Sequence, residues 1–204
     1  KIIIGAASGD PGALVAQGTA ANPIVFTSNE DSPAAGDWYN LNFLNTTEDA
    51  STILEHCVVE YAGYSQAAIY LSNASPTIRN ARVNHSKNKG IYITTGEPVI
   101  DACQFSDNLN YDLYYSGTVG GTVSKCTNNN GIYLVATGSV DFSGNTIHQN
   151  NAFPIKTYAD IVGAIVSTST IDNVDTASYL EVSGGTLSRD ATWTAAIPYL
   201  INGA

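Results

Sequence analysis

Four tyrosines recur at a nearly constant spacing, each in the middle of a similar apolar tripeptide. They are Tyr70, Tyr92, Tyr114 and Tyr133, at intervals of 22, 22 and 19 residues. Mostly apolar residues flank them, as in Ile69-Tyr70-Leu71, so strand alternation points the tyrosines away from the core. Such an exposed row, with rungs about 4.8 Å apart, could brace a sheet through aromatic pairs. It could equally form a flat binding platform for sugar rings, with Asn, Ser and Thr neighbours bonding the hydroxyls.

A second group of residues has the types needed for acid–base chemistry. Basic side chains gather at Arg79, Arg82, Lys87 and Lys89, and Asp101 follows one repeat later. In a polysaccharide lyase, a basic side chain removes the proton next to the carboxylate of a uronate sugar. These basic residues, together with Asp101 as an acid, could supply that chemistry. The same residues also fit a solvated strand face with a charged turn, and we predict no catalytic residue.

Metal-binding residues are scattered rather than clustered. His56 lies near Glu55 and Glu60, but we expect it to face solvent on an outward strand face. Acidic loops at 29–37 and 47–49 offer carboxylates to Ca²⁺, yet neither matches an EF-hand or a nonapeptide calcium repeat. We therefore predict no metal site and no cofactor, with Ca²⁺ left open as a loosely bound ion.

The repeat period indicates how these residues are positioned. A fixed interval of about 20–25 residues is typical of solenoids. Each unit is too short for a strand–helix–strand crossover, which takes roughly 30 residues. The fold class predicted is therefore all-β, a right-handed parallel β-helix with about 22 residues per coil. Long strands are expected at Ile53–Val59, Thr77–Val83 and Val99–Phe105, with Asn-rich turns between coils.

The three cysteines share the same period. Cys57, Cys103 and Cys126 are 46 and 23 residues apart, so they fall in one column of the coil, and Ala81 occupies the same column. Small apolar residues in a column indicate an inward stack, and we expect buried free thiols. A strained disulfide between Cys103 and Cys126 is the alternative, because adjacent rungs lie within disulfide reach.

The coil is expected to occupy residues 1–157, with loop excursions at 29–37 and 45–51. Residues 158–204 lose the period and are expected to hold the last coil or coils and a junction to a following module. Ile161–Val166 and Tyr179–Val182 are predicted to be strands. No capped amphipathic helix is evident, and neither end of the chain shows an amphipathic cap for the coil.

Composition excludes some partners and favours others. The 204 residues carry 18 acidic and 8 basic side chains, a net charge of −10, which argues against nucleic acid. The sequence contains no run of 18 apolar residues, so no membrane span is predicted. Few lysines, many Asn, Ser and Thr residues and no methionine suggest an extracellular or cell-surface segment of a longer protein.

Two groups of motifs resemble known proteins. Ser75-Pro76-Thr77-Ile78 and Asn88-x-Gly90-Ile91-Tyr92-Ile93 resemble the β-helix repeats of the pectate-lyase-like superfamily. Gly36-Asp37-Trp38 and the stretch 54–63 are similar to extracellular β-helix modules of large microbial surface proteins, as is 14–28. Gly185-Thr186-Leu187 and residues 192–201 resemble the start of a next module in such proteins. The resemblance implies the fold, whereas the superfamily's activities range from lyases and hydrolases to adhesins and filaments.

The resemblance also implies where catalytic residues would stand. Hydrolases of the superfamily use clustered Asp residues and a His, whereas here the acidic residues Asp101, Asp107, Asp112 and Asp141 form no such cluster. None of the three histidines, His56, His85 and His148, lies between glycines.

Three functions follow as hypotheses. The first is a structural or adhesive module that stacks end to end into a rod or filament, with neighbouring copies as partners. The second is a carbohydrate-binding module that holds a polysaccharide on Tyr70, Tyr92, Tyr114 and Tyr133. The third hypothesis is a polysaccharide lyase or hydrolase. We favour the first two and therefore expect no enzyme activity.

Overall fold

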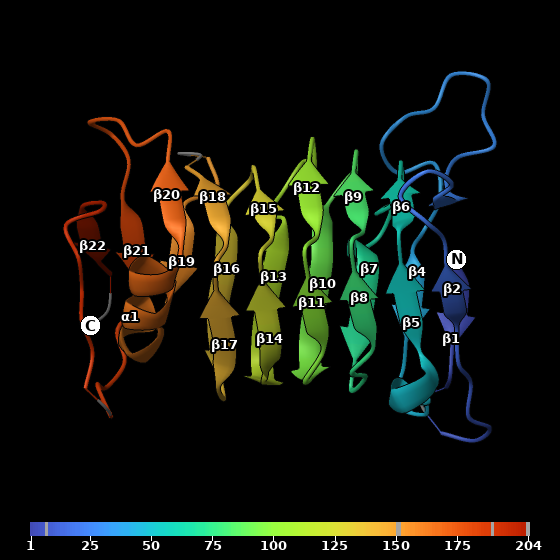
Figure 1. The fold of residues 1–204 in the computed structure, drawn as a ribbon, viewed down its shortest axis with the longest axis horizontal. Helices are drawn as coiled ribbons and strands as arrows, with labels where there is room; N and C mark the ends of the chain where they lie inside the picture. Colours follow the sequence, from blue (N-terminus) through green and yellow to red (C-terminus); the bar gives the residue numbers. More distant parts are fainter. Residues whose placement is uncertain (7, 150–151, 189, 203–204) are drawn as a thin grey trace.

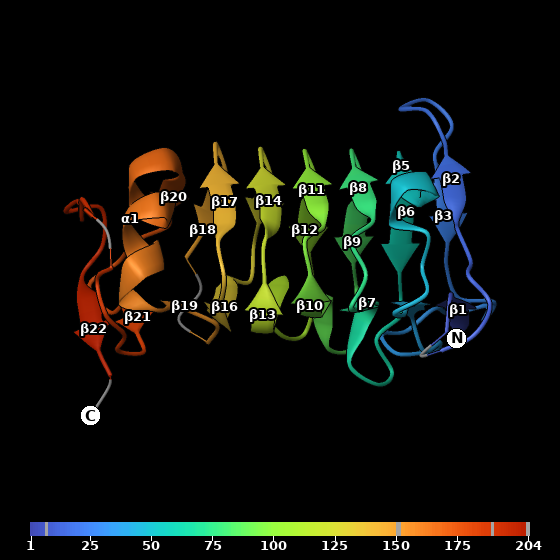
Figure 2. The same cartoon turned by 90° about the horizontal axis from the view of Figure 1, so that it is seen from below.

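The chain winds into a coil of short parallel strands, three to a turn, stacked along one axis (Figures 1 and 2). The computed structural model describes residues 1–204 except 7, 150–151, 189 and 203–204. All strand pairings of the described residues are parallel, and each joins a strand to the equivalent strand of the next coil. The predicted parallel β-helix is therefore confirmed.

The strands form three sheets, which are the three sides of the coil. The nine-stranded sheet contains β1 (Ile2–Ile4), β4 (Leu41–Phe43), β7 (Ala67–Ser72), β10 (Lys89–Gly96), β13 (Leu113–Val119), β16 (Ile132–Thr137), β19 (Ile155–Thr157), β21 (Leu180–Val182) and β22 (Tyr199–Ile201). The six-stranded sheet contains β2 (Val15–Gln17), β5 (Ile53–Glu55), β8 (Thr77–Arg79), β11 (Val99–Asp101), β14 (Gly121–Ser124) and β17 (Val140–Ser143). The seven-stranded sheet contains β3 (Ile24–Phe26), β6 (Cys57–Glu60), β9 (Arg82–Asn84), β12 (Gln104–Ser106), β15 (Thr127–Asn128), β18 (Thr146–His148) and β20 (Thr170–Asp172).

The core is built from columns of equivalent apolar residues. In the nine-stranded sheet, Ile69, Ile91, Leu113 and Ile132 pair in register, and all four are fully buried. Burying such a side chain stabilises the fold by about 1.5–3 kcal/mol. Strand alternation then forces the next residue outward, which fixes the direction of the tyrosines.

Each long strand predicted from the sequence is in fact two strands that meet at a corner. Ile53–Val59, for example, divides into β5 and β6 at His56. The corner residues His56, Asn80, Ala102 and Lys125 have left-handed φ angles of 47°, 51°, 52° and 53°. One left-handed residue turns the chain from the six-stranded into the seven-stranded sheet, because it breaks the extended path without adding a loop.

The prediction of a strand at Ile161–Val166 is wrong, because these residues lie in a helix, one that has no side-chain cap at its N-terminus. Residues Ala159–Thr168 form α1, which lies beside β17 at the end of the six-stranded sheet (Figure 2). Isoleucine and valine favour strands, but Ile161, Val162, Ile165 and Val166 repeat at helical spacing and are all buried. The helix therefore covers the core where another strand of this sheet would lie.

The nine-stranded sheet continues beyond the helix. Leu180 pairs with both Ile155 and Tyr199, so β21 and β22 extend the sheet to Ile201. The predicted strand at Tyr179–Val182 is confirmed as β21. Residues 29–37 contain no strand, and residues 45–51 include the 3-10 turn η1 (Asp49–Ser51). None of the helices in the described residues is long and apolar enough to cross a membrane.

Candidate functional site: the tyrosine row

The structure brings the four predicted tyrosines together on the outside of the nine-stranded sheet. Tyr70, Tyr92, Tyr114 and Tyr133, called the tyrosine row below, pair in register on β7, β10, β13 and β16. Their ring centroids are 5.3, 5.1 and 4.1 Å apart in chain order. The alignment predicted from the repeat spacing is therefore confirmed.

The rings are turned toward one another rather than laid flat. Tyr70 and Tyr92 are tilted by 50°, Tyr92 and Tyr114 meet edge to face, and Tyr114 and Tyr133 stack with planes 7° apart. The sequence predicted that these side chains would be exposed, but in the structure all four are half-buried. Because neighbours cover much of each face, the row offers a ligand mainly ring edges and hydroxyl groups.

Two further aromatic residues thicken the row. The Tyr111 ring packs edge to face against Tyr114, Tyr133 and Phe153, at centroid distances of 6.0, 5.5 and 5.4 Å. Sequence analysis missed Tyr111 and Phe153 because both precede strands and lie outside the repeated tripeptide. Burial raises the pKa of Tyr111 to about 12 and also raises that of Tyr114, so both phenols stay protonated near neutral pH.

Two lysines lie over the row. The Lys89 ammonium is 5.0 Å from the Tyr92 ring centroid and 4.6 Å from that of Tyr114. Burial lowers the pKa of Lys89, and the ion pairs of the described residues do not include it. Lys156 lies 5.8 Å from the Tyr133 centroid but is bonded to Glu181 at 2.6 Å. Lys89 thus adds one positive charge to the aromatic surface.

The residues considered for acid–base chemistry are divided among three places. Arg79 and Asp101 do pair in register on β8 and β11. Arg79, however, is paired with Glu55, and Asp101 accepts a hydrogen bond from the Ser124 hydroxyl at 2.6 Å and forms an ion pair with Lys125 at 3.5 Å. Arg82 faces out of the seven-stranded sheet, while Lys87 and Lys89 precede or begin β10. The arrangement does not join them into one basic group.

The candidate calcium loops have structural uses for their carboxylates. Asp37 accepts hydrogen bonds from the Ser28 hydroxyl and the Ala34 amide, which lower its pKa. Asp49 accepts a bond from the Ser75 amide of the next coil at 2.7 Å. Within the described residues, no group of three or more His, Cys, Asp and Glu side chains could hold a metal ion.

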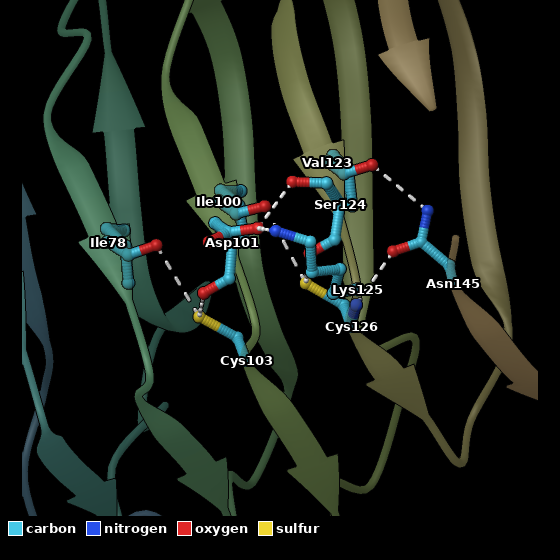
Figure 3. A network of polar contacts seen from close by, with 9 residues as sticks. All are labelled: Ile78, Ile100, Asp101, Cys103, Val123, Ser124, Lys125, Cys126 and Asn145. Carbon is cyan, nitrogen blue, oxygen red and sulfur yellow. Dashed lines mark hydrogen bonds and ion pairs between the residues drawn. The ribbon is translucent and has the colours of Figure 1, made fainter. Parts of the chain in front are cut away.

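The cysteine column lies inside the corner between the six- and seven-stranded sheets. All three thiols are free and buried, as predicted. The Cys103 and Cys126 thiols point toward backbone carbonyls of the preceding coil, Ile78 and Ile100, at 3.5 and 3.7 Å (Figure 3). A hydrogen bond with the Cys126 thiol, together with burial, raises the pKa of Cys103. These thiols serve as core residues.

Asn145 continues the column one coil further and is buried as well. Its side-chain oxygen accepts from the Cys126 amide at 2.9 Å, and its amide nitrogen donates to the Val123 carbonyl at 3.0 Å (Figure 3). An asparagine therefore replaces a cysteine here because both of its polar ends find backbone partners.

A buried carboxylate was also missed by sequence analysis. Asp112 is fully buried and accepts bonds from the Asn108 side chain at 2.8 Å and the Asn129 and Asn130 amides at 2.6 and 2.8 Å. Burial nevertheless raises its pKa to about 6. The sequence gives no signal for this role, because Asp112 looks like an ordinary residue of a polar turn.

The stacked coils of parallel strands, the columns of buried residues inside them and the left-handed corners between the sheets together define a parallel β-helix protein. In agreement, a family model described as right-handed beta helix region matches residues 42–191. The chain belongs to this family. No match to a curated protein or to a solved structure was found.

Proposed function

We propose that the chain is an extracellular structural or adhesive module that stacks end to end into a rod or filament. The observation that carries the proposal is the open first coil. Among the described residues, β1, β2 and β3 each have a strand neighbour on one side only. Each therefore leaves a row of backbone donors and acceptors for another strand.

The core side chains of this first coil support the same proposal. Ile24 and Phe26 are only half-buried, whereas Cys57 and Val59, their partners in the next coil, are buried. At the other end, Leu200 and Ile201 of β22 are 46% and 62% exposed. A strand of a second copy laid on the first coil would cover Ile24 and Phe26 and join the two cores.

Backbone directions suggest how to block this contact without disturbing the coil. The Ile24 amide donates to the His56 carbonyl of the next coil, and the Ile2 amide donates to Asn40. Because amides alternate along a parallel strand, those of Val25 and Ile3 point to the open edge. Proline at either position removes an edge donor while keeping the bonds to the next coil.

The test measures the mass and length of particles against concentration, by sedimentation velocity and small-angle scattering. We expect the unaltered chain to form elongated species that grow end to end at high concentration, and Val25→Pro with Ile3→Pro to stop that growth. Val25→Thr with Ile3→Thr is the matched control and should still assemble. A compact monomer of the unaltered chain at every concentration would refute the stacking proposal.

A second candidate function is carbohydrate binding at the tyrosine row. It is favoured by the Lys89 ammonium, which is in none of the ion pairs of the described residues, and by four phenols in register. A serine hydroxyl, Ser116, lies 3.2 Å from the Tyr92 oxygen. Replacing Tyr92 and Tyr114 by serine should abolish retention on a glycan array, whereas Tyr64→Ser, outside the row, should not. Retention that survives both row changes in a folded protein would remove this candidate.

We propose no catalytic activity. Arg79 and Asp101, the nearest approach to a base and an acid, are already bonded to Glu55 and to Ser124 and Lys125. The alternative, a polysaccharide lyase or hydrolase, predicts release of unsaturated or reducing sugars from acidic and neutral polysaccharides. Release of either product, lost on changing Arg79 or Asp101, would overturn this part of the proposal.

A further inference from the structure

Two hollows on the outside of the seven-stranded sheet share a wall. The first, of about 260 Å³, lies at the corner where the six-stranded sheet turns into the seven-stranded one. The second, of about 180 Å³, lies further along the same strands. Arg82 and Gln104, which pair in register on β9 and β12, line both. We call the pair of hollows the Arg82 cleft.

The cleft is lined by hydrogen-bonding groups. Thr19, His56 and Asn80 line the first hollow, and Asn84, Ser106 and Asn129 line the second. No Asp or Glu is among the described residues that line either hollow. This composition stands out in a chain with 18 acidic and 8 basic residues. The cleft therefore lacks the carboxylates that would repel an anion.

The arginine at its centre is available for a ligand. Arg79, three residues earlier, is held by Glu55 through two contacts of 2.9 and 3.0 Å. The ion pairs of the described residues include no partner for Arg82, whose side chain is exposed. Its guanidinium carries five N–H donors in a planar fork that fits two oxygens of an oxyanion.

The walls of the first hollow are fixed by the coil. Asn80 and Ala102 are left-handed corner residues in successive coils, and the small side chain of Ala102 leaves space beside Asn80. The loop at Thr19 closes one side and is held by bonds between the Thr19 and Asn22 backbones and from the Gly18 amide to Glu55. The buried residues Cys57, Val58 and Ala81 also line this hollow. The backbone walls of this hollow are thus in place before any ligand arrives.

From this placement we infer that the Arg82 cleft is a binding site for an oxyanion, a carboxylate, sulfate or phosphate, either free or carried by a hydroxyl-rich molecule such as a sugar. The Arg82 guanidinium holds the oxyanion, and the amides of Asn80 and Gln104 and the Thr19 hydroxyl bind neighbouring oxygens. The site lies on a different side of the coil from the tyrosine row and goes beyond the module function proposed above. With one unpaired arginine in a chain of net charge −10, the cleft does not suit a polyanion such as nucleic acid.

The test follows backbone amide NMR shifts of the whole chain, at low ionic strength, during titration with inorganic phosphate, sulfate, glucose 6-phosphate, glucuronate and glucose. We expect the anions, and not glucose, to shift the amides of His56, Asn80 and Gln104. A higher affinity for the sugar anions than for inorganic phosphate identifies a sugar as carrier, and equal affinities identify the free oxyanion.

Variants connect the shifts to Arg82. Arg82→Gln should weaken anion binding at least tenfold, roughly the value of one charge-assisted contact, and Arg82→Lys should weaken it less because the charge remains. Lys87→Gln, which removes an exposed cation outside the cleft, is the matched control and should leave affinity unchanged. The inference is wrong if no anion shifts these amides, if glucose shifts them equally, or if folded Arg82→Gln binds like the unaltered chain.

Discussion

Tyr114 and Tyr133 stack face to face on adjacent coils, with ring centroids 4.1 Å apart and planes within 7°. Their backbones pair in register, so the coil itself places one ring over the other. This contact braces β13 against β16 whether or not the row binds a ligand.

The first prediction concerns the energy of this contact. Leucine at Tyr114, at Tyr133 and at both should give a coupling free energy of about 0.5–1.5 kcal/mol in a double-mutant cycle. Urea unfolding followed by circular dichroism measures it. The control cycle pairs Tyr70 with Tyr133, which lie in the same row without touching, and its coupling should be near zero. Equal coupling in both cycles would mean that stacking adds nothing specific.

The second prediction concerns Asp112 and pH. Its pKa is raised from 3.8 to about 6 in the folded chain. In the native state Asp112 therefore takes up a proton below about pH 6, whereas in the unfolded state it takes up this proton only below about pH 4. This group then adds stability as pH falls from 7 to 4, by about 2–3 kcal/mol, and the gain is lost again as pH rises through 6.

The measurement compares unfolding free energies of the unaltered chain and Asp112→Asn between pH 7 and 4. The variant cannot take up this proton, so the unaltered chain should gain stability relative to it as pH falls. Other carboxylates, such as Glu55 with its lowered pKa, act in the opposite direction but cancel in the comparison. A constant difference across the range would show that Asp112 titrates normally.

Features that depend on strand alternation and period could be predicted from the sequence, and features that depend on single backbone angles could not. The tyrosine row and the cysteine column were found because side chains in equivalent positions must share a face. The corner at Ala102 was missed, because alanine does not signal a left-handed angle as glycine or asparagine does. The Arg82 cleft was missed for the same reason, since it forms at such a corner.

The helix α1 shows a second limit. Strand-forming residue types dominate the run Ile161-Val162-Gly163-Ala164-Ile165-Val166, but its bulky residues are spaced as on one face of a helix. The structure follows the helical spacing and not the strand preference. Packing also contributes, because a Cβ on Gly163 would lie only 3.3 Å from the Thr192 backbone. Contacts with the chain near Thr192, far along the sequence, cannot be read from the run itself.

The third prediction concerns the thiols. Cys57, Cys103 and Cys126 are at most 1% exposed. In the native state none should react with Ellman's reagent on the time of mixing, and unfolding in guanidinium should release three equivalents. The same count with and without prior reduction would show that Cys103 and Cys126 are unbonded. Fewer equivalents without reduction would reveal a disulfide and contradict the structure.

The fourth prediction tests the corner at Ala102, whose φ of 52° is unfavourable for alanine. Asn80 occupies the equivalent corner one coil earlier, at 51°. Ala102→Asn should therefore stabilise the chain by about 0.5–1 kcal/mol, because asparagine tolerates the left-handed region. Ala102→Val should destabilise it by more than 1 kcal/mol, since a β-branched side chain is strained there. Thermal unfolding measures both, and a stabilising valine would show that the corner is not left-handed in solution.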